Sequence, residues 1–212
     1  MKKILSLAIG FFLTFAAFAQ NNDYLVINWD TIYDQCGYID QSGQMAIAHG
    51  KYSFCMTDTF RTFAVVYKGN EGWIGIDRQE NTIFTIMQYD NGPDFPSENM
   101  FRITKGQKIG FANLEGEVVV PPKYDAAYPF QEGLAAFCVG CRNERMGEVS
   151  MWKDGQWGFL DKKGKVVIEP IFDKVNIGFK SGKIKVKKNN VIFEINKTGE
   201  RVQEKVAEPK KN

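Results

Sequence analysis

The residues with the most specific chemistry in this sequence are its four cysteines, Cys36, Cys55, Cys138 and Cys141. Four cysteines allow three disulfide connectivities, and local pairing of Cys36 with Cys55 and of Cys138 with Cys141 is the first expectation. Gly140, inside the second pair, suits the tight turn that this bridge needs. Buried thiols, or a redox or metal-binding role for the Cys138-x-x-Cys141 motif, are the alternatives.

A catalytic Cys-x-x-Cys motif is expected beside a helix N-terminus, which lowers the pKa of the thiol, and no such pattern surrounds Cys138 and Cys141. A four-cysteine zinc site shows two closely spaced pairs, and Cys36 and Cys55 are too far apart to make one. His49 is the only histidine, and the sequence has no nucleophile elbow whose serine or cysteine it could activate. Phosphate-binding glycine loops are absent. The sequence therefore predicts no enzyme, no metal and no cofactor.

A second group of candidates lies in an insertion, Cys138 to Met151, that interrupts an internal repeat. It contains Arg142 and Arg145, and Trp152 follows it. Loops that break a repeat often line a binding face, and Arg and Trp frequently anchor contacts. We therefore predict Arg142, Arg145 and Trp152 as binding residues for a protein or a cell-wall glycan, with a loop of no function as the alternative.

The elements that would position these residues follow the repeat itself. Residues 106–137 and 155–186 have similar sequences, and in both an aromatic-Asp pair begins 14 residues after an anchor glycine. Two weaker copies precede them, and a partial copy occupies residues 193–199. The anchor glycines are Gly37, Gly75, Gly110 and Gly158.

Each copy carries two turn signals. After the anchor glycine comes Asp or Asn, then two residues, then Gly, as in residues 161–164. Asp77 opens this turn in the second copy, where Asn81 ends it one residue later. A second turn, such as Asp154-Gly155, precedes the anchor glycine. Two hairpins predict three short strands per copy, and we expect the prolines after the third strand to end it: Pro121, Pro122 and Pro170.

The fold class predicted is all-β, an array of about four three-stranded antiparallel β-repeats. Each unit is too small to bury its own apolar face, so the units must stack. Three strands per copy favour an open, solenoid-like stack, and an incomplete β-propeller is the alternative.

The segment from Trp157-Gly158 to Lys165, followed by Glu169-Pro170, resembles the consensus of the WG-repeat family, also called KWG repeats. Trp157, directly before its anchor glycine, alone occupies the family's Trp position in the standard register. Trp73 stands two residues before Gly75, which is one residue too early. The resemblance implies a β-rich bacterial repeat without a general catalytic role.

Residues 1–19 are predicted to be a cleavable signal peptide. Lys2 and Lys3 precede an apolar run from Ile4 to Phe18, and Ala17-Phe18-Ala19 is a small-x-small cleavage site. The run is shorter than the roughly 20 residues that span a bilayer, and no later segment is long and apolar enough. We therefore expect an exported protein, periplasmic or secreted.

Cleavage would remove two lysines and leave 25 basic and 25 acidic residues, so a nucleic-acid partner is not expected. The predicted organisation is a repeat domain at residues 20–204 followed by a basic flexible tail at 205–212. The predicted function is a non-catalytic binding or scaffold protein of the bacterial cell envelope. A thiol redox or metal-binding protein is the alternative.

Overall fold

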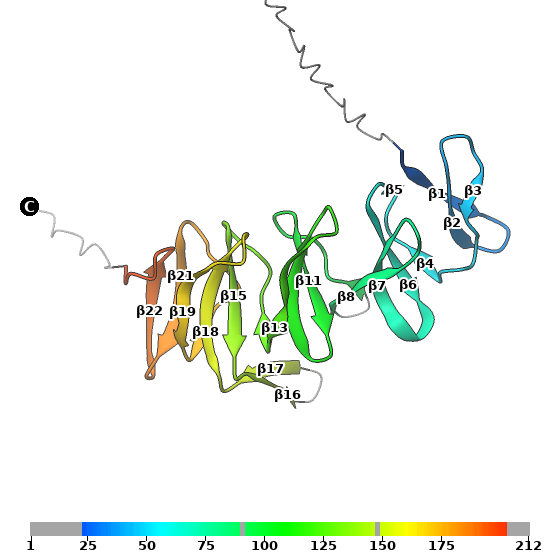
Figure 1. Ribbon diagram of the computed structural model, residues 1–212. Helices are drawn as coiled ribbons and strands as arrows, with labels where there is room; N and C mark the ends of the chain where they lie inside the picture. The colour runs from blue at the N-terminus through cyan, green and yellow to red at the C-terminus, as the bar shows by residue number, and fades with distance from the viewer. Residues whose placement is uncertain (1–22, 90–91, 147–148, 203–212) are drawn as a thin grey trace, which may run out of the picture.

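The computed structural model describes residues 23–89, 92–146 and 149–202 as an all-β chain (Figure 1). The expected signal peptide at 1–19 and basic tail at 205–212 lie outside the described residues. Within the described ranges the sole helical element is a short 3-10 turn, η1 (Gly69–Glu71), and no helix there is long and apolar enough to cross a membrane.

Four three-stranded antiparallel units follow one another along the chain, and a fifth has two strands. We number them repeats 1 to 5, and Figure 1 shows them side by side in an open array. The predicted β-repeat array is therefore confirmed. The strands are β1 (Leu25–Asp30), β2 (Gln35–Ile39) and β3 (Met45–Ile47); β6 (Phe63–Lys68), β7 (Gly72–Asp77) and β8 (Thr82–Ile86); β11 (Met100–Lys105), β12 (Lys108–Asn113) and β13 (Val118–Tyr124); β15 (Leu134–Val139), β18 (Gln156–Asp161) and β19 (Val166–Phe172); and β21 (Lys183–Lys188) and β22 (Val191–Asn196).

Short strands lie in the connections between repeats, and two more form the insertion in repeat 4. The connecting strands are β4 (Phe54–Cys55), β5 (Thr59–Phe60), β9 (Gln88–Tyr89), β10 (Gly92–Pro93), β14 (Ala126–Ala127) and β20 (Lys174–Val175), and the inserted ones are β16 (Arg142–Met146) and β17 (Val149–Lys153).

Each anchor glycine lies in the middle strand of its repeat, and at Gly37, Gly110 and Gly158 the backbone of the third strand crosses it closely, whereas Gly75 faces the Phe84 ring. A Cβ atom on Gly158 would lie 2.5 Å from the carbonyl oxygen of Ile168 and 2.8 Å from the nitrogen of Pro170. Gly110 faces the backbone of Val120 in the same way. Since no other residue lacks a Cβ atom, glycine is required there by close backbone approach.

The same crossing corrects the expectation for the prolines. Pro121 and Pro122 lie inside β13, and Pro170 lies inside β19. Both third strands shift register opposite the anchor glycine, at Gly110 and Gly158. A residue in such a bulge donates no ladder hydrogen bond, so proline is accommodated without ending the strand.

The turn after the middle strand has one geometry in all five repeats. Asp161 Oδ1 accepts hydrogen bonds from the backbone N–H groups of Lys163 and Lys165, each at 2.9 Å. This pattern explains the repeated Asp and Asn as turn residues. The equivalent acceptors are Asp40, Asp77, Asn113 and Asn196.

Repeat 2 keeps this register although it lacks the glycine. Glu80 takes the glycine's place with a φ of 63°, and Asn81 is the residue that follows the turn. The Glu80 carboxylate accepts hydrogen bonds from Lys51 at 2.7 Å and from the Tyr52 hydroxyl at 3.0 Å. These contacts offset the cost of a left-handed backbone at a residue with a side chain.

Stacking depends on the two unlike faces of each repeat. The residues directly before and after the anchor glycine point to one face, which we name the flanking face. The other side, at the level of the glycine, is the glycine face. Ile109 and Phe111, on the flanking face of repeat 3, pack against Ala135, Phe137 and Leu160, on the glycine face of repeat 4.

Repeat 2 is turned the other way. Ile74 and Ile76, its flanking face, pack against Cys36 and Tyr38, the flanking face of repeat 1. Its glycine face is therefore directed towards the glycine face of repeat 3. The two repeats join edge to edge through β8 and β11, which pair at Ile86 and Ile103, and so form one seven-stranded sheet.

A ladder of glutamates links the outer turns of repeats 3 to 5. Glu98 Oε2 accepts a hydrogen bond of 2.9 Å from the backbone N–H of Gly133. Glu132 makes the same bond one repeat further along, to Gly182, at 2.8 Å. Each glutamate thus caps the turn of the next repeat and fixes the stacking register.

The close approach at the anchor glycine generates the first prediction. We expect Gly158→Ala to lower the free energy of unfolding by about 2 kcal/mol or more, because the new methyl group collides with backbone that cannot move without breaking the repeat. Gly92, which has no atom within 4 Å of an added Cβ, is the control. Urea unfolding should show Gly92→Ala within about 1 kcal/mol of the wild type, and an equally mild Gly158→Ala would contradict the account.

The glutamate ladder generates a pH dependence. The pKa of Glu132 is lowered, first by the hydrogen bond from Gly182 and further by Lys197. A carboxylate whose pKa is lower in the folded state stabilises the fold above its unfolded pKa of about 4.3, and this contribution is lost as the pH falls through the folded-state pKa. We expect Glu132→Gln to lose less stability than the wild type between about pH 5 and pH 3, measured as thermal denaturation across that range. Identical pH profiles would contradict this role.

Candidate functional site

The insertion in repeat 4 is a β-hairpin and not a loop, and it projects from the lower edge of the array in Figure 1. Trp152 pairs with Asn143, and Arg142 pairs with Lys153. Side chains of paired residues lie on the same face of a hairpin, and successive side chains along one strand lie on opposite faces. Arg145 therefore lies on the same face as Trp152, while Arg142 lies on the opposite face, so the three predicted binding residues do not form one surface.

Two of these residues also have structural contacts. Trp152 is partly buried and packs against the core between repeats 4 and 5, which includes Trp157. The Arg142 Nε atom donates a hydrogen bond of 2.5 Å to Asp154 Oδ2 at the base of the hairpin. A binding role for Arg142, Arg145 and Trp152 stays a prediction.

Both locally paired disulfides are present, with Cα–Cα distances of 6.0 Å for Cys36–Cys55 and 5.9 Å for Cys138–Cys141. The first joins β2 of repeat 1 to β4, which pairs with β6 of repeat 2, and so clamps these repeats together. The second closes the base of the inserted hairpin. All four cysteines are buried, and burial limits the access that thiol–disulfide exchange requires.

The other polar candidates have structural partners. His49 Nε2 lies 2.8 Å from Asn28 Oδ1, and the carboxylates of the turns bind their own backbone. Among the residues placed by the structure, no group of three or more His, Cys, Asp or Glu side chains is arranged to hold a metal ion.

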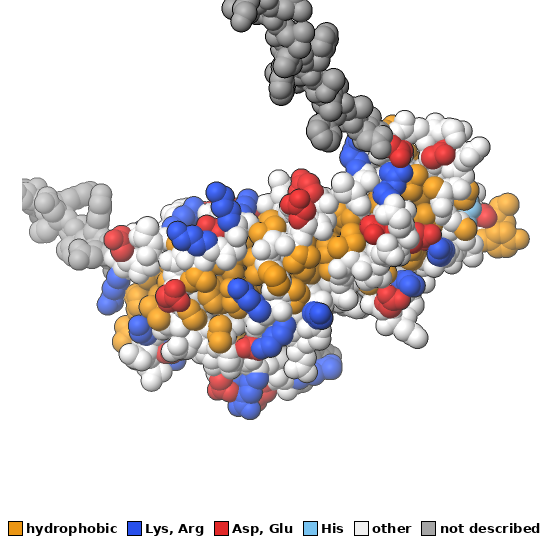
Figure 2. Space-filling model, viewed as in Figure 1, with side chains coloured by type: hydrophobic (Ala, Val, Ile, Leu, Met, Phe, Trp, Pro, Cys, Tyr) orange, Lys and Arg blue, Asp and Glu red, His pale blue; other side chains and the backbone are white. Residues whose placement is uncertain are grey.

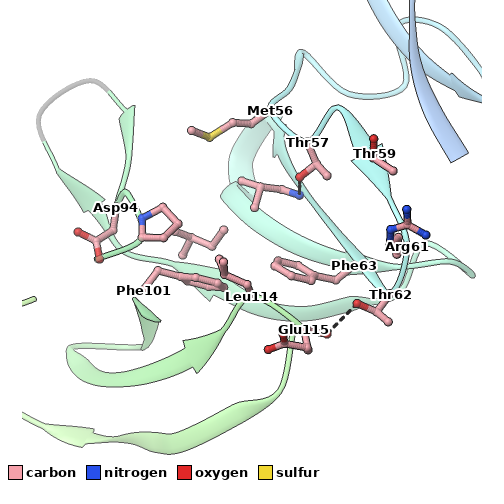
Figure 3. A pocket seen from close by; sticks show the side chains of 13 residues that line it. Met56, Thr57, Thr59, Arg61, Thr62, Phe63, Asp94, Phe101, Leu114 and Glu115 are labelled. Atoms are coloured by element: carbon pink, nitrogen blue, oxygen red, sulfur yellow. Dashed lines mark hydrogen bonds between the residues drawn. The ribbon is translucent and has the colours of Figure 1, made fainter. Parts of the chain in front are cut away.

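A groove that the sequence did not reveal lies where repeats 2 and 3 join (Figure 3). Its volume is about 490 Å³. The base is formed by Phe63 and Val65 of repeat 2, by Ile86 at the edge of that repeat, and by Phe101 of repeat 3. The Phe63 and Phe101 rings stack with their centroids 5.8 Å apart. Both are buried glycine-face residues, and the more exposed apolar side chains that line the groove are Met56, Val65 and Leu114.

Hydrogen bonds hold the walls of the groove in place. The Thr62 hydroxyl donates to the carbonyl oxygen of Glu115 at 2.8 Å, which ties the two repeats together across the mouth. On the third side, Asp94 forms a buried ion pair with Arg102, and the Arg102 guanidinium also donates to the carbonyl oxygen of Ala127 at 3.0 Å. The groove is therefore preformed, as most binding pockets are.

One sequence signal marks this groove in retrospect. Phe130 and Phe179, aromatics of the segments that connect repeats 3 to 4 and 4 to 5, are buried between the stacked units. The equivalent aromatic between repeats 2 and 3 is Phe95, which is 68% exposed. The flanking face on which Phe95 would pack is already covered by repeat 1.

Comparison with known protein families identifies two of the copies of the internal repeat. A family model described as WG containing repeat matches residues 109–140 and 157–191. Each match begins in a middle strand, at Ile109 in β12 and at Trp157 in β18. The expected resemblance is confirmed for these segments. A search of curated proteins found no match.

The two disulfides should differ in their contribution to stability. The Cys36–Cys55 bond spans 19 residues and the Cys138–Cys141 bond spans three, so the first restricts the unfolded chain more. We expect Cys36→Ala with Cys55→Ala to cost about 3 kcal/mol, and Cys138→Ala with Cys141→Ala about 2 kcal/mol. Urea unfolding of the two double variants tests this order. Detection of free thiols in the denatured, unreduced wild type would contradict both bonds.

Proposed function

We propose that this chain, in which WG repeats form the third and fourth units, is a non-catalytic binding protein that holds a partner protein in the groove between repeats 2 and 3. The observation that carries the proposal is the reversal of repeat 2. The glycine faces of repeats 4 and 5 are covered by the flanking face of the preceding repeat, but here two glycine faces meet and leave a groove with Met56, Val65 and Leu114 in its wall.

The ligand class follows from what covers such a face elsewhere. The glycine face of repeat 4 is covered by the flanking face of repeat 3, and the aromatic side chains Phe111 and Phe130 belong to the same core cluster. A partner segment with an aromatic side chain would supply the same kind of contact at Phe63 and Phe101. Hydrophobic side chains continue as a band along the visible face of the array (Figure 2), so an extended segment has apolar surface to follow.

The mouth of the groove suits a peptide better than a small ion. Arg61 and Glu115 place opposite charges there, and Thr59 and Thr62 add hydroxyl groups. Charges of both signs are thus present among the described lining residues, and the polar groups of a peptide backbone find partners of both kinds. Peptide recognition by an apolar anchor with polar rim contacts is a common mode.

The proposed setting is the bacterial cell envelope or the extracellular space. Two observations support this location. The Cys36–Cys55 and Cys138–Cys141 disulfides persist in oxidising compartments, and residues 1–19 have the composition of a signal peptide.

Selection of peptides from a displayed random library against the purified chain tests the proposal. We expect the selected peptides to share an aromatic residue. We expect Leu114→Lys, a substitution at the exposed rim of the groove, to weaken their binding about tenfold or more, because it places a charge beside the apolar base. Calorimetric titration of the variant with a selected peptide measures the loss.

Val167→Lys is the matched control, because Val167 is 41% exposed and Leu114 is 43% exposed, yet Val167 does not line the groove. It should bind the peptide as the wild type does. Selected peptides without aromatic residues, or equal binding by both variants, would overturn the assignment of the groove.

A further inference from the structure

A second candidate surface lies across repeats 1 and 2, where four aromatic rings form a continuous row. The ring centroids of Trp29 and Phe54 are 6.2 Å apart, those of Phe54 and Trp73 are 5.7 Å apart, and those of Trp73 and Tyr67 are 5.3 Å apart. Trp29 and Phe54 are 40% and 47% exposed, whereas Tyr67 is partly buried and Trp73, at 9%, is buried. Large aromatic side chains in contact with water and with one another mark a binding surface.

The backbone holds this row rigidly. Phe54 is paired with Tyr67, and Tyr67 is paired with Trp73, on the adjacent strands β4, β6 and β7. Trp29 is paired with Cys36, whose disulfide partner Cys55 follows Phe54 in the chain. One covalent bond therefore joins the two halves of the row, and the rings are positioned before any ligand arrives, which lowers the entropic cost of binding.

The described residues that line one end of the row are aromatic or polar and carry no charge. A hollow of about 450 Å³ at one end is lined by Phe54, Tyr67 and Trp73 together with Ser53 and Gln88. These last two residues add a hydroxyl and an amide group, and among the described residues no lysine, arginine, aspartate or glutamate lines the hollow. An anion or a cation would find no opposite charge among them.

We propose that this row binds a neutral saccharide chain. The face of an aromatic ring carries partial negative charge, which attracts the polarised C–H groups on one face of a pyranose ring. Hydroxyl and amide groups beside the rings are hydrogen-bond partners for sugar hydroxyls. The two exposed rings, Trp29 and Phe54, have centroids 6.2 Å apart and planes inclined by 72°, so each can contact its own part of an extended chain. The proposal is independent of the groove between repeats 2 and 3.

Titration calorimetry with chitohexaose and with cellohexaose, each up to about 5 mM, tests the proposal within the range of weak affinities. Binding of at least one of them is expected. Trp29→Ala and Phe54→Ala should each weaken it about tenfold, the size typical of an aromatic anchor. Ile32→Ala is the matched control, because Ile32 is 84% exposed in the same repeat but lies outside the row; it should leave the affinity unchanged.

Loss of the clamp gives a second readout. The variant with Cys36→Ala and Cys55→Ala should bind the saccharide more weakly than the variant with Cys138→Ala and Cys141→Ala, with folding of each confirmed by circular dichroism. No binding of either saccharide by the folded wild type would overturn the proposal. So would binding that survives both Trp29→Ala and Phe54→Ala, or binding of choline, a cation probe, in place of the saccharides.

Discussion

The passage of the third strand over the anchor glycine is the constraint from which the rest of this molecule follows. The backbone at Ile168 and Pro170 comes so near to Gly158 that a methyl group has no room. The third strand bulges there in repeats 3 and 4, and these repeats consequently curl and have two faces of different shape. Because the faces differ, the order in which they meet along the array has structural consequences that an array of flat sheets would lack.

The repeat in the sequence is offset from the unit in the structure. The matched segments begin in a middle strand and end at or beyond the first strand of the following unit, as residues 109–140 run from β12 to just past the end of β15. Repeats 4 and 5 therefore each begin with a strand, β15 or β21, that belongs to the preceding matched segment, which interlocks neighbours. At the far end, Lys183, Lys185 and Lys187 replace the apolar residues that face onward in repeat 4, so the last unit presents a charged outer face, as capping repeats do.

Local features of this fold could be predicted from the sequence, and the nonlocal ones could not. The Asp or Asn turns and the anchor glycines depend on residues within one copy, and the two disulfides follow from spacing. The reversal of repeat 2 depends on which face of repeat 1 it meets, and no residue pattern inside repeat 2 encodes that choice. The groove could not be predicted from the sequence for this reason. Its one local sign is Phe95, which is exposed whereas its counterparts Phe130 and Phe179 are buried. Glu80 was hard to anticipate because its left-handed conformation is supported by Lys51 and Tyr52, almost thirty residues earlier.

Regular stacking also explains where a binding site can arise in such a protein. The flanking faces of repeats 3 and 4 fill the glycine faces of repeats 4 and 5, and Phe130 and Phe179 close the remaining space. Such an interface has no room for a ligand. A site requires an interruption of that order, and the edge-to-edge junction of repeats 2 and 3 is such an interruption, where Leu114 is exposed and Met56 and Val65 are partly exposed at the groove. The buried Arg102–Asp94 pair stands at this junction. A buried ion pair adds little net stability but penalises alternative arrangements strongly, so it is suited to keep the junction open and in one geometry.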